Sequence, residues 1–455
     1  MFVGRKKESR YLEENYAKEA SCVLVVYGHR GVGKTSLLLR FAKEKPLHYF
    51  CARPCSGQEQ ILLWEKELDR AGTEAAGNAE GSGFDKIFAR LAADGGAKKL
   101  LVIDEFQYLI RYAEDFMPAL LRYVQGSRTP VMVVLLSSSV SFVETDFVPR
   151  IGPLAASISG FYKLGELGFM DCVNYFQKYS TRQCMEAYSI LGGLPAYWAA
   201  FSAEKNIGEN IRDAILSPSG VLHDEGERMV SSELRELNVY STILNCLAGG
   251  MNKLNDLHVH SGFSRAKISV YLKNLMEREL VEKLFPYDNA SNANAKKGVY
   301  RVTLRFLEFY FRFIFENRSA LEQSDAAEFY KNYILPYLPA FHQSNFRKVC
   351  GEYLDILNHN NMLPIKASRS GEWVGKSGTI DIVMQDEDWE SILAFCDWES
   401  AVIGMSALEK DLRIAEEARL HPDHVYLFAT GSFSDELKAF AEQNKSVRLI
   451  DIDTL

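Results

Sequence analysis

The sequence lacks the features that mark membrane, secreted and zinc-binding proteins. No apolar run approaches the roughly 18 residues that a membrane span needs. The opening residues, MFVGRKKESRY, have no apolar core of the kind found in a signal peptide. None of the eight cysteines forms a C-x-x-C pair, and the nine histidines do not cluster at the spacing of metal ligands. We therefore expect a cytoplasmic protein with no membrane partner.

An excess of positive charge is also missing. The 455 residues carry a formal net charge of −8, so binding to nucleic acid would require a local basic patch. A hydrophobic content of 47% and a charged content of 25% are ordinary for a globular protein. At this length the chain is expected to form roughly two to four domains.

The most informative motif is a glycine-rich loop, GHRGVGKT, at Gly28–Thr35. It fits G-x-x-x-x-G-K-[ST], the phosphate-binding loop of P-loop nucleoside triphosphatases. An apolar, β-branched run at Cys22–Tyr27 precedes it and a helical apolar pattern at Ser36–Ala42 follows it, so we expect the loop between a strand and a helix. Glycines there let backbone N–H groups surround a phosphate, and the helix N-terminus adds partial positive charge. The residues of this segment predicted to bind nucleotide are Gly28, His29, Arg30, Gly31, Val32, Gly33, Lys34, Thr35 and Ser36.

A second motif, at Lys98–Gln107, has the pattern of a buried strand that ends in two carboxylates. Sites in parallel sheets lie at the carboxyl ends of strands. Asp104 is therefore predicted to hold Mg²⁺ together with the Thr35 hydroxyl, and Glu105 to orient and deprotonate the attacking water. Lys34 would reach the β- and γ-phosphates. The predicted catalytic residues are thus Lys34, Asp104 and Glu105, with ATP and Mg²⁺ as cofactors.

The rest of the chain divides into segments of different pattern. Up to about residue 165 strands and helices alternate, which predicts a parallel α/β domain. A helical pattern, broken at Gly192–Pro195, extends to about residue 233. Three compact amphipathic helices and two short strands follow, which predicts a helix-turn-helix with a β-wing, and an α/β pattern resumes after about residue 346. The two strands are Val281–Phe285 and Val299–Thr303, and polar stretches expected to form loops are 70–83 and 286–297.

Across nearly its whole length the chain resembles the archaeal-type P-loop ATPases of the AAA+/STAND group. The residues that carry this resemblance, besides the two motifs above, are Phe2–Glu8 (FVGRKKE), Leu191–Tyr197 (LGGLPAY) and Val134–Ser141 (VLLSSSVS). The resemblance implies that Arg5 lies near the nucleotide base, that Pro195 approaches the adenine, and that one serine of 137–139, Ser138 or Ser139, senses the γ-phosphate. Read without the resemblance, the last two segments are a helix break and a serine-rich turn.

The resemblance also implies a division into domains. The expected fold class is α/β: a P-loop NTPase (AAA+-like) domain with a helical lid, a winged helix-turn-helix and a C-terminal restriction-endonuclease-like α/β domain. The boundaries are 1–165 for the ATPase core, 166–233 for the lid, 234–345 for the winged helix with linker helices, and 346–455 for a degenerate nuclease-like domain.

One departure from the family pattern concerns the arginine finger. Where the family has P-L-Y-G-R-R, this chain has PLAASI at Pro153–Ile158, so the arginines are absent. The arginine finger would then have to come from Arg150 or from a partner protein. Because such an arginine supplies about 10³–10⁵ in rate where it is used, we expect slow or partner-dependent hydrolysis.

The other departures fall in the nuclease-like domain. The family's metal-binding and lysine positions align here with Arg347, Phe395 and Asp397, and Asp381 alone is kept. A nuclease of this class needs an acidic cluster for Mg²⁺ and a lysine beside the attacking water. Strand alternation is expected to put Asp397 and Glu399 on the face of Phe395. We expect this domain to cut no DNA, and Arg347 to pair with Asp381.

Local positive charge points to DNA in the helix-turn-helix segment. Between Met251 and Arg305 ten lysines and arginines stand against five acidic residues. The expected recognition helix begins after Ser264, and Lys296 and Lys297 in the wing suit phosphates. Its core side chains are Ile268, Leu272 and Leu275, and its exposed ones Arg265, Lys267, Ser269 and Tyr271.

Two functions follow from the sequence. The first is an ATPase that couples nucleotide state to double-stranded DNA through the winged helix. Because winged helices also dock proteins, the alternative is a nucleotide-gated scaffold or regulator with little turnover, which binds a protein partner or forms a homo-oligomer.

Overall fold

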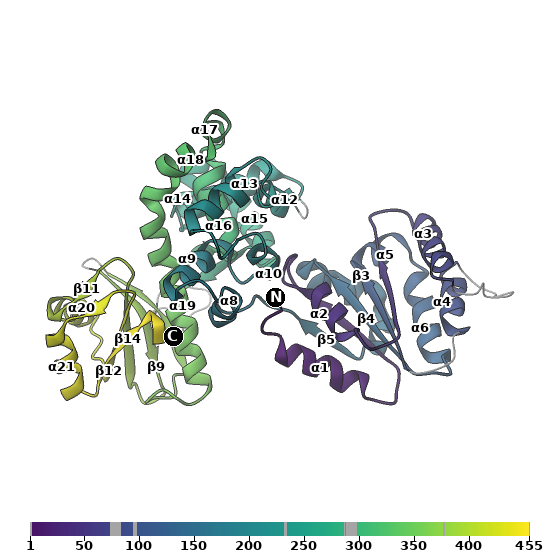
Figure 1. Cartoon of the computed structure of the whole chain (residues 1–455), viewed down its shortest axis with the longest axis horizontal. Coiled ribbons are helices and arrows are strands. Elements are labelled where there is room, and N and C mark those ends of the chain that lie inside the picture. Colours follow the sequence, from purple (N-terminus) through teal and green to yellow (C-terminus); the bar gives the residue numbers. More distant parts are fainter. Residues whose placement is uncertain are drawn as a thin grey trace. The chain divides into compact units, whose positions relative to one another are not determined.

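The computed structural model describes residues 2–72, 83–93, 98–231, 234–285, 287, 298–375 and 378–454. The chain forms two compact units (Figure 1). Residues Phe2–Leu167 together with Leu194–Ala196 make up the N-terminal unit, and Gly168–Gly193 together with Tyr197–Leu455 make up the C-terminal unit. No helix among the described residues is both long and apolar enough to cross a bilayer.

A five-stranded parallel sheet forms the centre of the N-terminal unit. Its strand order is β2-β3-β4-β1-β5, so β4 lies between the strands that carry the two motifs. Every residue of β3 and β4 is buried, as expected for strands covered on both faces. The strands are β1 (Cys22–Tyr27), β2 (Leu47–Cys51), β3 (Lys99–Asp104), β4 (Val131–Ser137) and β5 (Gly160–Lys163).

Helices cover both faces of this sheet (Figure 1). On one face Trp64 is buried from α3, where its ring contacts those of Phe50, Phe84 and Phe116 and belongs to the main core of the unit. The helices α1 and α2 lie on the other side. The helices of the unit are α1 (Lys6–Tyr16), α2 (Lys34–Phe41), α3 (Gly57–Arg70), α4 (Gly83–Ala93), α5 (Gln107–Tyr112), α6 (Phe116–Gly126), η1 (Phe142–Phe147), α7 (Val148–Ile151) and η2 (Gly152–Ser157). Most of the polar stretch 70–83, expected to be a loop, lies outside the described residues.

The C-terminal unit begins with helices. The first group is α8 (Phe169–Tyr175), α9 (Thr181–Leu191), α10 (Pro195–Trp198), α11 (Ile207–Asn210), η3 (Ile211–Leu216) and α12 (Glu225–Ser231). The first two residues of α10 belong to the N-terminal unit. The second group is α13 (Leu237–Ala248), α14 (Leu254–Ser261) and α15 (Arg265–Glu277), followed by the antiparallel pair β6 (Val281–Leu284) and β7 (Val299–Val302). The wing residues Lys296 and Lys297, and nearly all of the polar stretch 286–297, lie outside the described part of the chain.

Buried aromatic helices connect these groups to a second sheet. The aromatic run after β7 forms α16 (Arg305–Phe309) and η5 (Tyr310–Phe315), whose phenylalanines are mostly buried. Next come α17 (Arg318–Gln323), α18 (Ala326–Phe329), η6 (Tyr330–Ile334), η7 (Leu335–Tyr337) and the long helix α19 (Leu338–His359). The helix α19 passes through position 345/346, where the sequence suggested a domain boundary.

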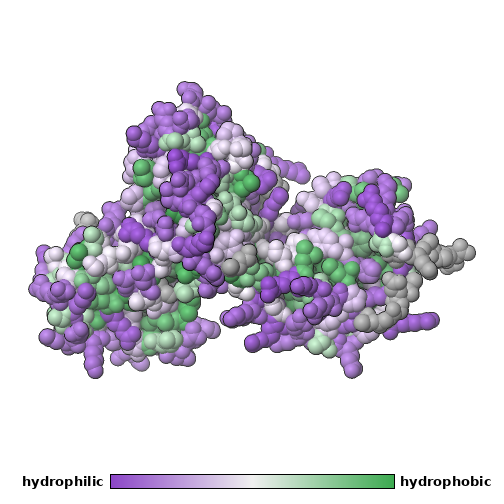
Figure 2. Space-filling view, in the orientation of Figure 1, coloured by the Kyte–Doolittle hydropathy of each residue, from purple (hydrophilic) through white to green (hydrophobic). Residues whose placement is uncertain are grey.

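The second sheet has five strands in the order β14-β12-β10-β9-β8. Strands β8 to β10 are antiparallel, whereas β10, β12 and β14 are parallel. The elements are β8 (Arg369–Val374), β9 (Thr379–Gln385), β10 (Ser391–Asp397), β11 (Val402–Ile403), α20 (Met405–Glu417), β12 (His424–Ala429), β13 (Ser432–Phe433), α21 (Asp435–Gln443), β14 (Val447–Asp451) and η8 (Ile452–Thr454). Figure 2 shows mainly hydrophilic side chains on the visible face of each unit, with smaller hydrophobic groups between them, which is ordinary for a folded surface.

Candidate functional site

The glycine-rich loop joins β1 to α2 and has a backbone that only glycine adopts easily. Gly28, Gly31 and Gly33 have φ angles of 156°, 85° and 97°. A Cβ atom added to Gly28 would lie 2.2 Å from the backbone oxygen of Leu164. The conformation and the close packing both require glycine, and they leave a backbone cradle in which a phosphate fits.

Lys34 is the first residue of α2 and its side chain is buried inside this loop. Its Nζ donates hydrogen bonds to the backbone oxygens of Gly28 at 2.8 Å and His29 at 3.0 Å. The ammonium group is thus held at the inner side of the loop, where it would meet phosphate oxygens. Of the other predicted loop residues, Val32 is buried, His29 is half-buried, and Arg30 and Ser36 are exposed.

Thr35, Asp104 and Tyr49 meet at the carboxyl end of the sheet. The hydroxyls of Thr35 and Tyr49 both donate to Oδ2 of Asp104, at 2.8 and 2.7 Å. Burial, followed by this bond to Asp104, raises the pKa of the Tyr49 phenol, so Tyr49 remains a donor. Hydroxyl and carboxylate oxygens are the ligands that Mg²⁺ prefers, so the two predicted metal ligands, Thr35 and Asp104, fit the ion.

Tyr49 was not predicted from the sequence. It reaches Asp104 because β2 pairs in parallel with β3 and brings Cys51 level with Asp104. Tyr49 lies two residues earlier, on the same face of the strand as Cys51. The available signal was a tyrosine in the region of alternating strands and helices, but the sequence does not give the order of the strands in the sheet.

Glu105 lies next to this group and makes hydrogen bonds with three residues, Asp104, Ser138 and Gln107. Its own N–H donates to Oδ1 of Asp104 at 2.9 Å, and its φ angle of 54° is in the left-handed region. The Ser138 hydroxyl donates to Glu105 Oε2 at 2.6 Å, and the Gln107 amide donates to the same oxygen. Of the two serines left open by the sequence, Ser138 contacts Glu105, while the Ser139 N–H donates to Ser137 Oγ at 3.1 Å.

Arg5 lies against the backbone of the loop. Its Nη2 donates to the oxygens of Val32 and Gly165, each at 2.8 Å, and its Nη1 to Glu8 at 3.0 Å. With the side chain almost fully buried, these contacts brace the loop. A contact between Arg5 and the nucleotide base stays a prediction.

Residues Leu194–Ala196 return to the glycine-rich loop from far along the chain. The Ala196 N–H donates to the Gly31 oxygen at 3.2 Å, and Cγ of Pro195 would lie 3.4 Å from a Cβ atom on Gly33. Pro195 thus forms part of the wall of the loop, and its approach to adenine stays a prediction. Arg150 is exposed at the end of α7.

In the second sheet Arg347 and Asp381 form the expected ion pair, with 2.8 Å between Nε and Oδ1. Asp381 Oδ2 also accepts the Cys396 N–H at 2.8 Å. Burial raises the pKa of Asp381 to about 6, while Arg347 and the Cys396 amide act in the opposite direction. Phe395 belongs to the apolar core. Asp381 is therefore neutralised by an arginine of the chain itself.

The expectation that Asp397 and Glu399 share the strand face of Phe395 holds for Asp397, which lies two residues after Phe395 in β10, and is wrong for Glu399. Strand β10 ends at Asp397, so the alternation does not reach Glu399. The Asp397 carboxylate instead closes a turn by accepting the N–H groups of Glu399 and Ser400 at 3.0 and 2.8 Å. Within the described residues, no group of three or more His, Cys, Asp or Glu side chains is placed to hold a metal ion.

The helix α15 has the two faces that the sequence predicted. Ile268, Leu272 and Leu275 are fully buried. Arg265, Lys267 and Ser269 are exposed, whereas Tyr271 is half-buried and donates to Glu236. The Lys267 ammonium lies over the ring of Phe263 at 4.9 Å.

Two family models match parts of this chain. Residues 2–201 match an ATPase domain predominantly from Archaea, and residues 310–410 match archaeal and bacterial proteins of unknown function. An uncharacterized protein of Methanocaldococcus jannaschii is 27% identical over 404 residues, which is 88% of each chain.

Solved structures show weaker likeness. A Walker-type ATPase of Pyrococcus abyssi is 16% identical, with a TM-score of 0.48 over 68% of this chain and 96% of that one. The ORC2 protein of Aeropyrum pernix, solved with ADPNP and ADP, is 14% identical, with a TM-score of 0.49 over 70% and 94%. Both TM-scores lie below 0.5 and add nothing to the geometry above. With its phosphate-binding loop, its acidic strand end and the family match over residues 2–201, the chain contains an archaeal-type ATPase domain.

Proposed function

We propose that this protein binds ATP with Mg²⁺ and hydrolyses it, and that the nucleotide state controls the binding of double-stranded DNA. The observation that carries the ATPase part is the convergence of Thr35, Asp104 and Glu105 beside the glycine-rich loop. Bound ATP and Mg²⁺ would supply the reacting phosphoryl group and the positive charge that polarises it.

The residues of the chain have distinct roles in this proposal. Lys34 and the loop N–H groups bind the β- and γ-phosphates, and Thr35 and Asp104 hold the metal. A carboxylate oxygen of Glu105 accepts the proton of the attacking water. Because Ser138 and Gln107 bind one oxygen of Glu105, they orient this base, and Ser138 is the polar group that would sense the γ-phosphate.

A titration with ATP and a hydrolysis assay test the site. Lys34→Ala should abolish ATP binding, because it removes the charge that meets the phosphates. Glu105→Gln should bind ATP and lose hydrolysis, because the metal ligand Asp104 remains. Lys43→Ala, which removes an exposed lysine just beyond α2, is the matched control and should behave as wild type. Equal ATP affinity of Lys34→Ala and wild type would refute the site.

The DNA part rests on α15, which resembles a recognition helix in a winged helix. It presents Arg265, Lys267 and Lys273 to solvent over a buried apolar face. Reversing Arg265 and Lys267 to Glu should weaken duplex binding and flatten its dependence on salt, since neutralised phosphates set that slope. The same reversal at the exposed Lys410 and Arg413 of α20 is the control. Absence of duplex binding by wild type at low salt would overturn the proposal.

One observation favours the alternative of a nucleotide-gated scaffold with little turnover. The segment that carries arginines in the family that this chain resembles is Pro153–Ile158 here. It lies in η2 except for Ile158, and it contains no arginine. In this alternative α15 docks a protein. The hydrolysis rate, measured with and without duplex DNA, separates the two: stimulation by DNA supports the ATPase, and a very low rate in both supports the scaffold.

We extend the proposal to the second sheet as a nuclease-like domain without nuclease activity. Its support is the ion pair of Arg347 with Asp381, which places a guanidinium beside the carboxylate that the resemblance identifies as a metal ligand. Wild type should leave plasmid and linear DNA uncut in Mg²⁺ or Mn²⁺. Cleavage that disappears in Asp381→Ala would contradict it. The constructive test is Arg347→Glu, Phe395→Glu and Asp397→Lys together.

A further inference from the structure

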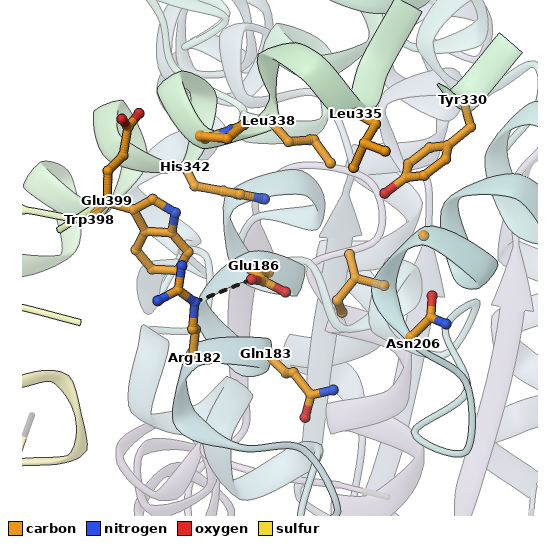
Figure 3. Close-up of a pocket in the computed structure, with 13 residues that line it drawn as sticks. Arg182, Gln183, Glu186, Asn206, Tyr330, Leu335, Leu338, His342, Trp398 and Glu399 are labelled. Carbon is orange, nitrogen blue, oxygen red and sulfur yellow. Dashed lines mark ion pairs between the residues drawn. The ribbon is translucent and has the colours of Figure 1, made fainter. Parts of the chain in front are cut away.

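A cavity of about 580 Å³ lies within the C-terminal unit (Figure 3). This volume is in the range of small-molecule sites, roughly 300–1,000 Å³. Its walls come from α9, from the segment that starts α11, from the helices between Tyr330 and His342, and from Trp398 and Glu399 after β10. Its lining residues thus include Arg182, Gln183 and Glu186 from the archaeal ATPase match, and seven from the segment 310–410.

One wall of the cavity is apolar and the opposite wall carries a carboxylate. Leu335, Leu338 and Pro339 supply the apolar side. Figure 3 shows the carboxylate of Glu186 and the hydroxyl of Tyr330 directed into the space between these walls. A ligand with a short hydrocarbon chain and one polar end matches this arrangement.

The sign of charge at Glu186 decides which polar end fits. Arg182 faces it, but Nε and Oε1 are 3.6 Å apart, which is longer than the roughly 2.7–2.9 Å of a close charge-assisted bond. The same guanidinium lies 4.7 Å from the Trp398 ring and donates to Thr430 Oγ1 at 3.2 Å. Burial raises the pKa of Glu186 and Arg182 opposes this, so a second cation beside the carboxylate would stabilise its ionised form.

The other titratable groups that face the cavity, His342 and Tyr330, are uncharged. Burial, together with the Arg182 charge, lowers the pKa of His342 to about 3, so this ring is neutral. Its Nδ1 is hydrogen-bonded with Ser189 Oγ at 2.6 Å. Burial raises the pKa of Tyr330, which stays a neutral phenol. Of the charged lining residues Arg182, Glu186 and Glu399, Figure 3 shows the Glu399 carboxylate directed away from the space that Glu186 faces. Glu186 is therefore the acidic group that a ligand between the two walls would meet.

We propose that this cavity binds the protonated amino group of an aliphatic amine, with Glu186 as its counter-ion. The methylene groups lie against Leu335, Leu338 and Pro339, and the Tyr330 hydroxyl accepts a second hydrogen of the ammonium. A free polyamine and a lysine side chain present the same chemistry, and the ligands used in the test distinguish them.

The test is calorimetric titration of the full-length protein with four small ligands. Putrescine represents a free polyamine. Nα-acetyl-lysine methylamide, whose ε-amino group is free, represents a lysine side chain. The neutral and anionic controls are 1,4-butanediol and succinate. Binding by either amine, and by neither control, is expected. Putrescine alone would identify a free amine, and the lysine derivative alone a lysine side chain.

Two variants with the same change of charge complete the experiment. Glu186→Gln should weaken amine binding about tenfold or more, since a charged hydrogen-bonding partner is lost. Glu328→Gln, at an exposed position outside the cavity, should bind as wild type. Thermal unfolding without ligand shows that both variants fold. No binding of either amine, equal binding by Glu186→Gln, or binding of succinate that is lost in Arg182→Gln would overturn the proposal.

Discussion

At the scale of single residues, the side chain of Asp104 accepts three hydrogen bonds in the proposed ATPase site. One oxygen accepts from Thr35 and Tyr49, and the other accepts the N–H of Glu105. These donors fix the carboxylate before any ligand arrives, which is the preorganisation that a metal site requires. Tyr49 thereby becomes a positioning residue.

We predict that Tyr49→Phe weakens the Mg²⁺ response without removing ATP binding. Loss of the donor should cost about 1 kcal/mol in unfolding free energy. It should also raise the Mg²⁺ concentration that half-saturates nucleotide binding. Tyr27→Phe is the control, because its hydroxyl makes an exposed 3.3 Å bond to Glu144. An unchanged Mg²⁺ titration and unchanged stability of Tyr49→Phe would show that the contact is incidental.

A second residue-scale prediction concerns Gly28. In Gly28→Ala the new methyl would overlap the Leu164 oxygen at 2.2 Å, in addition to the positive φ, so we expect a loss of about 2–4 kcal/mol. Gly152→Ala shares the positive φ but meets nothing within 4 Å, and should lose about 1 kcal/mol. Urea unfolding compares the two, and equal losses would refute the packing argument.

From the sequence, only the site residues that lie in a local motif could be predicted. Thr35, Asp104 and Glu105 follow from motifs whose strands end at one edge of the sheet, and the structure brings Thr35 and Asp104 together. Tyr49 and Ser138 depend on the strand order β2-β3-β4, which is set by tertiary packing. The local sequence does not determine this strand order.

At the scale of elements, α19 and β9 meet through the pair Arg347–Asp381. The helix α19 begins before residue 346, where the sequence predicted that an α/β pattern resumes, and strand β9 lies within that predicted α/β segment. Strand β8 was not predicted, because its residues, RSGEWV, are polar and lack alternation. Its pairing with β9 makes it an edge strand, for which sequence signals are weakest.

The acidic residues near this contact predict a dependence of stability on pH. Burial is the main cause that raises the pKa of Asp381 to about 6 and that of Asp411, in α20, to about 7. The folded state therefore binds these protons more tightly than the unfolded chain, whose Asp pKa is about 3.9. Their contribution to stability is lost as pH rises from about 4 to 7.

Removing either charge should therefore help most at the upper end of this range. Relative to wild type, Asp381→Asn and Asp411→Asn should gain unfolding free energy as pH rises from about 4 to 7. In Asp381→Asn the amide oxygen of the new side chain can still accept the Cys396 N–H. Asp388→Asn, in the exposed turn between β9 and β10, should run parallel to wild type. Denaturant titrations at several pH values measure the unfolding free energies. If those of Asp381→Asn and Asp411→Asn ran parallel to wild type across this pH range, the raised pKa values would be contradicted.

At the scale of the whole molecule, the chain is two units, of which the N-terminal one carries the proposed ATPase site. A ligand that binds only the folded state stabilises it by mass action, by about 2.7 kcal/mol at a hundred times its dissociation constant. The division of the C-terminal unit into lid, winged helix and nuclease-like domain stays a prediction.

We predict that ATP with Mg²⁺ slows hydrogen exchange in β1, β3 and β4 more than in β9, β10 and β12. The reason is that the nucleotide would bind to the N-terminal unit alone, so the opening of its sheet becomes less favourable. Lys34→Ala should remove the difference between the two sheets. Equal protection of both sheets in wild type would mean that the units open together.

The return of Leu194–Ala196 to the glycine-rich loop has a consequence for any fragment of this protein. These three residues belong to the N-terminal unit, whereas Gly193 and Tyr197 on either side belong to the C-terminal unit. A fragment that stops at Leu167 would lack the Ala196 donor to Gly31 and the proline beside Gly33. Cleavage after Leu167 would therefore leave Leu194–Ala196, which contact the glycine-rich loop, on the second fragment, while the loop itself stays on the first.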